Sequence, residues 1–194
     1  MHKLKIIIID LLKITFALSF IFLILNNNYV RPKIKKGSGY FKIEKREHKL
    51  LAGITGHTFL EMRDDEDNVL HQIHGLATDS EGNAKMIGNK KTDKLKVWIF
   101  DYDLYKETRK LDIGDTGVEI ASGTKDYINV IWDQAAACKE DINNKDISYP
   151  RYGFSLFSET ENSNSVTDTL ISCMQLENRD LGIFTPGKHN QLLK

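Results

Sequence analysis

Hydrophobic side chains first gather in one apolar run near the start of the chain, between Ile6 and Leu25. Four polar residues interrupt this run: Asp10, Lys13, Thr15 and Ser19. Its uncharged part, 14–25, has 12 residues, whereas a membrane-spanning helix needs about 20 apolar residues. An apolar core of this length behind a lysine-containing flank is typical of a signal peptide. We therefore predict that residues 1–29 are a signal peptide or a membrane anchor.

The residues after the apolar run favour an anchor that is not cleaved. Asn26-Asn27-Asn28-Tyr29 lacks the small-x-small pattern that signal peptidase recognises. Residues 30–40 form a basic linker that either lies against anionic lipid headgroups or is solvated. We expect a single-pass membrane protein with its domain outside the cytoplasm, or a secreted protein if the segment is cleaved.

The pattern then changes to strand and helix periodicities, which predict one globular domain over 41–194. Strands are expected at 53–62, 69–76, 95–100 and 118–121, the first two joined by a polar hairpin turn over 64–68. Two helices are expected, at 126–139 and 166–176. Strands followed by helices, without regular alternation, favour an α+β fold with a small antiparallel sheet and two main helices.

The helix ends carry recognisable capping residues. The first helix has an apolar stripe, Ile128, Ile131, Ala135, Cys138 and Ile142. Thr124 or Asp126 caps its start, and Asn143 and Asn144 end it. Ser165 and Asp168 have the spacing of a capping box for the second helix.

Charge and cysteine content narrow the class of protein further. The chain is neutral, with 27 basic and 27 acidic residues, but the part from Leu50 onward carries a net charge of −8. An acidic domain does not attract phosphate backbones, so we expect no nucleic-acid partner. Two cysteines, Cys138 and Cys173, are too few for a disulfide scaffold. Their helical apolar surroundings favour buried thiols over a bridge.

Two histidines on the predicted hairpin form the first part of a candidate site. A turn centred between Asp65 and Glu66 would place His57 and His74 directly opposite each other, on one face of the sheet. His71, three residues before His74, would point to the other face. The alternative is that these are strand histidines without a joint role.

A polar run before the second helix supplies the other part of the candidate site. A helix start offers free N–H groups and a partial positive charge, which stabilise a nucleophile and an oxyanion. In Asn162-Ser163-Asn164-Ser165, Ser163 would attack, His57 would take its proton and His74 would orient His57. Asn162, Asn164 and Ser165 would form the helix start and oxyanion site. The competing interpretation is that these residues only cap the helix.

Three short motifs resemble the circularly permuted papain-like superfamily, which includes NlpC-type peptidases and lecithin:retinol acyltransferase-like enzymes. The motifs are Gly56-His57-Thr58, His74-Gly75-Leu76 and Asn162-Ser163-Asn164-Ser165-Val166, with serine where the family has its cysteine. The resemblance implies a papain-like hydrolase or acyltransferase that acts on an amide or ester bond of a peptide or lipid substrate. The sequence has no phosphate-cradling glycine loop and no zinc-binding spacing, so we expect no metal and no cofactor. The alternative is a non-catalytic, membrane-tethered interaction domain, a pseudoenzyme.

Overall fold

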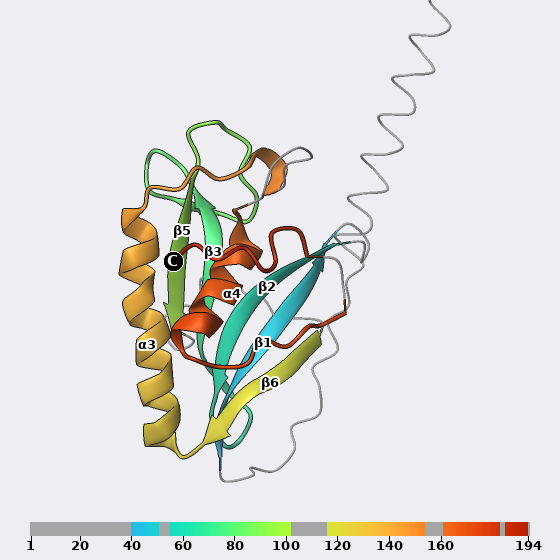
Figure 1. Ribbon diagram of the computed structural model, residues 1–194, viewed down its shortest axis with the longest axis vertical. Coiled ribbons are helices and arrows are strands. Elements are labelled where there is room, and N and C mark those ends of the chain that lie inside the picture. The colour runs from blue at the N-terminus through green and yellow to red at the C-terminus, as the bar shows by residue number, and fades with distance from the viewer. Residues whose placement is uncertain (1–39, 51–54, 102–115, 154–160, 183–184, 194) are drawn as a thin grey trace, which may run out of the picture. The chain divides into compact units, whose positions relative to one another are not determined.

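The computed structural model describes residues 40–50, 55–101, 116–153, 161–182 and 185–193. These form a six-stranded antiparallel sheet, two helices and one short 3-10 turn (Figure 1). The strands are β1 (Phe41–Leu50), β2 (Thr55–Arg63), β3 (Val69–Thr78), β4 (Ala84–Lys85), β5 (Lys94–Asp101) and β6 (Thr116–Gly123). The helices are α3 (Lys125–Asn144) and α4 (Ser163–Cys173), and the turn is η2 (Arg151–Gly153). The predicted α+β class, with its antiparallel sheet and two helices, is confirmed.

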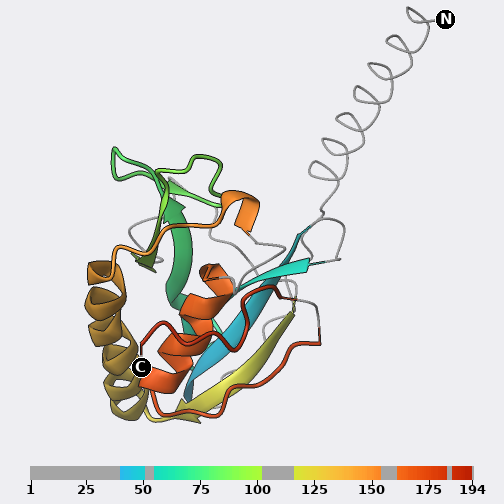
Figure 2. The same ribbon diagram turned by 45° about the horizontal axis from the view of Figure 1, so that its top comes forward.

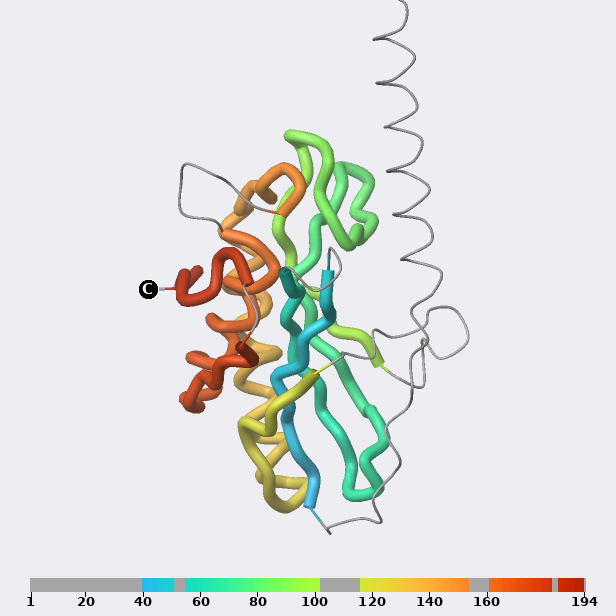
Figure 3. Tube along the Cα trace, turned by 90° about the vertical axis from the view of Figure 1, so that its right-hand side faces the viewer, coloured from blue at the N-terminus to red at the C-terminus, as the bar shows by residue number. Residues whose placement is uncertain are grey.

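Both helices pack on the same side of the sheet (Figure 3). We call this side the helix face and the opposite side the far face. The core between sheet and helices is apolar, and its buried members include Ile43, Leu60, Met62, Ile73, Leu95, Val97, Ile128, Ala135, Val166 and Leu170. Burial of these side chains is the main favourable term in folding. Phe59, Leu76 and Phe100 are also buried but do not belong to this core cluster.

Strand β1 was not predicted, because its sequence carries charges on both faces. On the helix face, Lys45 forms an ion pair of 2.9 Å with Asp168 of α4. On the far face, Arg46 lies 3.2 Å from Glu44 and 3.8 Å from Glu61. Charged side chains can be buried when they are paired in this way, so the simple polar-apolar alternation of a half-buried strand is missing.

The β2–β3 hairpin has a different register from the predicted one. Glu61 pairs with Gln72, and an irregularity follows between Met62 and Arg63. The Asp64 carboxylate accepts the backbone N–H groups of Glu66 and Asn68, which shapes a longer, asymmetric turn. The prediction that His57 and His74 lie directly opposite is therefore wrong. Since the shift is two residues, both side chains still share one face.

Helix α3 begins one residue before the predicted range 126–139 and continues to Asn144, one of the two asparagines expected to end it, whereas α4 is shifted toward the N-terminus. The predicted stripe of α3 faces the core, and Thr124 is its N-cap. Helix α4 begins at Ser163, three residues earlier than predicted, because Asn162 and Ser165 form its capping box. Asp168 is not part of a cap, since its carboxylate binds Lys45.

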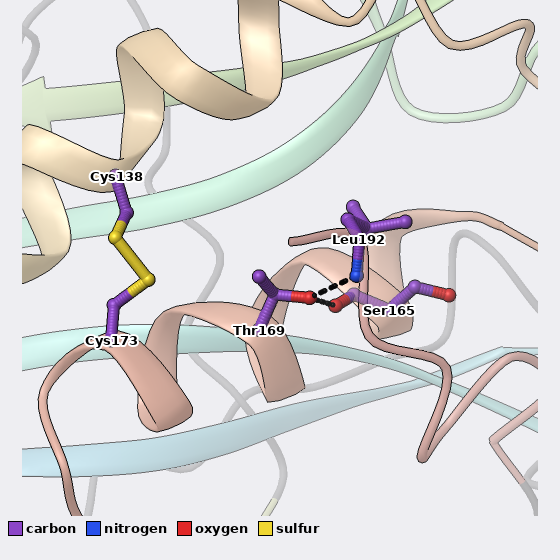
Figure 4. The surroundings of a disulfide bond; sticks show 5 residues. All are labelled: Cys138, Ser165, Thr169, Cys173 and Leu192. Atoms are coloured by element: carbon purple, nitrogen blue, oxygen red, sulfur yellow. Dashed lines mark hydrogen bonds between the residues drawn. A yellow bond between two sulfur atoms is a disulfide. The ribbon is translucent and has the colours of Figure 1, made fainter. Parts of the chain in front are cut away.

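A disulfide joins the two helices, which corrects the expectation of two buried thiols. Cys138 of α3 and Cys173 of α4 are bonded across 35 residues of sequence (Figure 4). Each cysteine does lie in a helical pattern, as predicted. The two patterns face each other, and sequence periodicity within a single helix cannot reveal that.

Within the described ranges, no helix is long and apolar enough to cross a membrane. The predicted signal peptide or anchor, 1–29, and the linker, 30–40 apart from Tyr40, lie outside these ranges.

Candidate functional site

His57 and His74 contact each other on the far face. The Nε2 atom of His57 lies 3.1 Å from Nδ1 of His74, and the two rings stack with centroids 5.4 Å apart. Phe59 stacks on the His74 ring with centroids 4.4 Å apart. Both histidines are buried. The structure thus brings together the two histidines that the sequence suggested as a pair.

The hydrogen-bonding direction of this pair follows from the Glu61 carboxylate, which is linked to His74 through the side chain of Gln72. The Glu61 carboxylate can only accept hydrogen bonds, so the Gln72 amide donates an N–H from Nε2 to it at 2.7 Å. The amide oxygen of Gln72 is then the atom that faces His74. His74 therefore donates Nε2–H to that oxygen, at 3.1 Å. A neutral His74 then accepts on Nδ1, and His57 must donate from Nε2. Arg63 completes the chain with a 2.6 Å bond to Glu61.

Burial keeps His57 in its neutral form. Desolvation, with a smaller contribution from the neighbouring His48, lowers the pKa of His57 from 6.5 to about 4. His48 is its direct cross-strand partner on β1. A neutral imidazole can accept a proton, but only one that reaches it on the far face.

Ser163 lies on the helix face, with the sheet between it and both histidines. A Cβ atom on Gly75 would come within 2.9 Å of the Ser163 Cα and 2.7 Å of the Val166 Cβ. Gly75 therefore faces α4, and its neighbour His74 points the opposite way, since side chains alternate along a strand. His71 lies on the same face as Gly75, two positions away in the helix-facing set, and packs against Trp132 of α3, as its predicted orientation requires.

The hydroxyl of Ser163 is paired with a phenol. Its Oγ atom lies 3.2 Å from the Tyr149 oxygen, and no hydrogen bond joins it to either histidine in the described structure. Burial raises the pKa of Tyr149 above its usual 10. At neutral pH that phenol is protonated and cannot act as a base for Ser163.

The start of α4 uses its own N–H groups. The Asn162 side chain accepts the N–H groups of Asn164 and Ser165 at 2.9 and 3.4 Å. In return, the Ser165 hydroxyl accepts the N–H of Asn162 at 3.2 Å and donates to the Gly187 carbonyl. Two of the N–H groups expected to form an oxyanion site are thus bound within the protein. The arrangement is that of a helix cap.

Asn164 replaces a missing strand. Strands β2 and β3 pair from Leu60 to Arg63 on the β2 side, so among the described strands none pairs with the earlier part of β2 on that edge. There the Asn164 side chain accepts the N–H of Thr58 at 2.8 Å and donates to the carbonyl of Gly56 at 3.1 Å. It also donates to the Pro186 carbonyl at 2.9 Å. The carboxamide of Asn164 thus joins α4 to the sheet and to the C-terminal segment.

Sequence reasoning missed Gln72, Glu61 and Tyr149 as partners of the candidate residues. The first two could have been found from strand alternation, because Gln72 precedes His74 by two residues and Glu61 follows His57 by four. No comparable signal identified Tyr149, which belongs to an irregular aromatic segment. Within the described residues, no group of three or more histidine, cysteine, aspartate or glutamate side chains could hold a metal ion.

Comparisons with known proteins add no identity to this geometry. No family model matches the chain, and neither the curated proteins nor the solved structures contain a match.

Proposed function

We propose that this protein is a non-catalytic interaction domain, exported and held at a membrane by residues 1–29. The observation that carries the proposal is the separation of Ser163 from His57 and His74 by the sheet. A serine becomes a nucleophile only when a base within hydrogen-bond reach takes its proton. The only side chain within that reach among the described residues is the Tyr149 phenol.

The hydrogen bonds of five of the six candidate residues support a structural role, and the sixth, Ser163, is paired with a phenol. The imidazoles of His57 and His74 belong to a buried chain that ends at Arg63. Asn162 and Ser165 cap α4, and Asn164 holds it to β2. Buried polar groups that are satisfied in this way define a unique packing arrangement, which is what a stable binding scaffold requires.

The disulfide supports the location outside the cytoplasm. Bridges such as Cys138–Cys173 form and persist in oxidising compartments and are rare in the cytosol. That agrees with the signal-like pattern of residues 6–25.

The competing function is the Ser/His hydrolase or acyltransferase of the permuted papain-like kind, acting on a peptide or lipid ester. Its support is the chain order of the motifs and the position of Ser163 at the first residue of α4. To work, it would need Ser163 and His57 to come together in a second conformation.

Labelling with a serine-reactive fluorophosphonate separates the two functions. The full chain in detergent micelles would be treated beside Ser163→Ala and His57→Gln variants, with an active serine hydrolase added as an internal control. We expect the hydrolase to be labelled and the protein to remain unlabelled. Labelling of the wild-type chain that disappears in both variants, with folding intact by circular dichroism, would establish the enzyme instead.

A further inference from the structure

Two turns at one end of the sheet are held together by one backbone and one side-chain hydrogen bond. The N–H of Tyr152 donates to the Gly88 carbonyl at 2.8 Å, and Nε of Arg151 donates to the Asn89 carbonyl at 3.3 Å. The η2 turn therefore adjoins the connection between β4 and β5, as Figure 2 shows for the orange turn beside the green loops. The two segments, 86–93 and 151–153, form one continuous surface.

This surface exposes two large apolar side chains. Tyr152 is 62% exposed and Ile87 is 47% exposed. Tyr152 also has a left-handed backbone, with φ of 60°, which is uncommon for a residue other than glycine. Strained backbone of this kind is found preferentially at functional sites. Here it presents an aromatic ring to solvent.

Contacts with the buried residues Tyr149 and Asp93 hold the two turns in place. The buried Tyr149 ring lies so close to Gly88 that a Cβ atom there would be 2.5 Å from it. The Asp93 carboxylate accepts the N–H groups of Asn89 and Lys90, both at 2.9 Å, and the Lys85 ammonium at 2.6 Å. These bonds lower the pKa of Asp93 to about 2. A surface ordered before binding loses little conformational entropy when a partner docks.

The surface is basic on a domain that is acidic. Lys90, Lys91 and Arg151 are exposed, and the only acidic residue of the two segments, Asp93, is buried and paired. The rest of the chain from Leu50 onward has an excess of acidic residues. The Arg151 guanidinium also lies 5.7 Å from the centre of the Tyr152 ring. We define Ile87, Lys90, Lys91, Arg151 and Tyr152 as the loop surface.

We propose that the loop surface docks an acidic segment of another protein, one that also presents an apolar side chain to Ile87 and Tyr152. The proposal rests on the proposed function as an interaction domain. Tyrosine and arginine are the residue types that most often dominate binding energy at protein interfaces. The two segments carry three exposed cations, and their own acidic residue is buried and paired, so this surface steers an acidic partner toward it. With only two exposed apolar side chains, the surface offers little area to insert into a lipid bilayer.

The test is selection from a phage-displayed library of random twelve-residue peptides on the full chain in detergent micelles. Enriched peptides would be synthesised with a fluorescent label and measured by anisotropy. We expect acidic peptides with aromatic or aliphatic residues. Their affinity should fall about tenfold in Tyr152→Asn, which tolerates the left-handed backbone, and in Arg151→Glu.

Matched variants on α3 control for general changes in surface. Tyr127 is 52% exposed on α3, so Tyr127→Asn removes a similar aromatic surface elsewhere. Lys139→Glu, also on α3, replaces a positive charge by a negative one, as Arg151→Glu does. Both should bind the selected peptides as the wild type does. Equal losses in control and test variants, or selected peptides without acidic residues, would overturn the proposal.

Two further outcomes are distinguishable from a failure of the proposed function. Binding of phosphatidylglycerol vesicles that is lost in Arg151→Glu, together with no enriched peptide, would replace the protein partner with a membrane surface. No enrichment and no vesicle binding would reject the loop surface as a docking site. Neither result changes the fluorophosphonate labelling, which tests catalysis separately.

Discussion

At the residue scale, two asparagine side chains act as substitutes for strand backbone. Asn164 binds the Thr58 N–H and the Gly56 carbonyl at the edge that β3 leaves free. Asn143 binds the N–H and the carbonyl of Val97, at 2.7 and 3.3 Å, on the edge strand β5. A carboxamide has one acceptor and one donor side, as a peptide group does. Each helix therefore has one asparagine that bonds to a strand as a neighbouring strand would.

Replacing Asn164 by alanine should be among the most destabilising substitutions in this protein. It leaves a buried N–H on Thr58 and a buried carbonyl on Gly56 unpaired, at a cost of about 3 kcal/mol in the free energy of unfolding. Ser163→Ala is the matched control, since it loses a single neutral hydrogen bond and should cost about 1 kcal/mol. Urea denaturation of the full chain would measure both. Equal costs would show that the helix is not held through Asn164.

The buried His57 makes stability depend on pH. Its pKa is about 4 in the folded protein and 6.5 in the unfolded chain. The unfolded state therefore binds more protons between these values, and stability falls as the pH decreases through this window. From pH 7 to pH 5 the loss due to His57 is about 2 kcal/mol.

The variant His57→Gln removes this titration while its amide can still donate to His74. We expect its free energy of unfolding to fall by about 2 kcal/mol less than that of the wild type between pH 7 and pH 5. The same urea titrations at the two pH values measure the difference. A wild type and a variant with the same pH dependence would mean that His57 is not buried as a neutral imidazole.

At the scale of elements, the disulfide joins Cys138, within α3, to Cys173, the last residue of α4. Closing a loop of 35 residues restricts the unfolded chain and stabilises the protein by about 4 kcal/mol. We expect dithiothreitol to lower the free energy of unfolding by that amount in the wild type. It should have no effect in a Cys138→Ala/Cys173→Ala variant, which serves as the control. An unchanged wild type under full reduction, verified by thiol titration, would contradict the stabilising role.

Elements with regular apolar spacing were predictable, and those built from paired charges were not. The stripe of α3 identified that helix and its Thr124 cap, because each apolar residue meets the core. Strand β1 was missed because the buried Lys45 and the partly buried Arg46 pair with carboxylates distant in sequence. The position of Ser163 relative to the two histidines also depends on packing between distant elements. His57 and His74 share a face by strand alternation alone, but the face on which Ser163 lies depends on how α4 packs on β3.

At the scale of the whole molecule, the disulfide and the apolar N-terminal run make one joint prediction. If residues 1–29 direct export, the full chain should contain no free thiols in cells, because Cys138 and Cys173 meet an oxidising compartment. A chain without residues 1–29 should stay in a reducing compartment and contain two free thiols. Gel shifts after alkylation with a maleimide-polyethylene glycol reagent, applied to cells lysed in acid, count these thiols directly.

The comparison between the two chains also separates export from stability. The reduced chain lacks the stabilisation of about 4 kcal/mol that the bridge provides, so it should be degraded faster than the exported one. A Cys138→Ala/Cys173→Ala version of the full chain is equally unable to form the bridge and still carries residues 1–29. If it is as short-lived as the chain without those residues, loss of the bridge explains the turnover. If it persists, the difference in compartment explains the turnover. Free thiols in the full chain in cells would refute the location outside the cytoplasm.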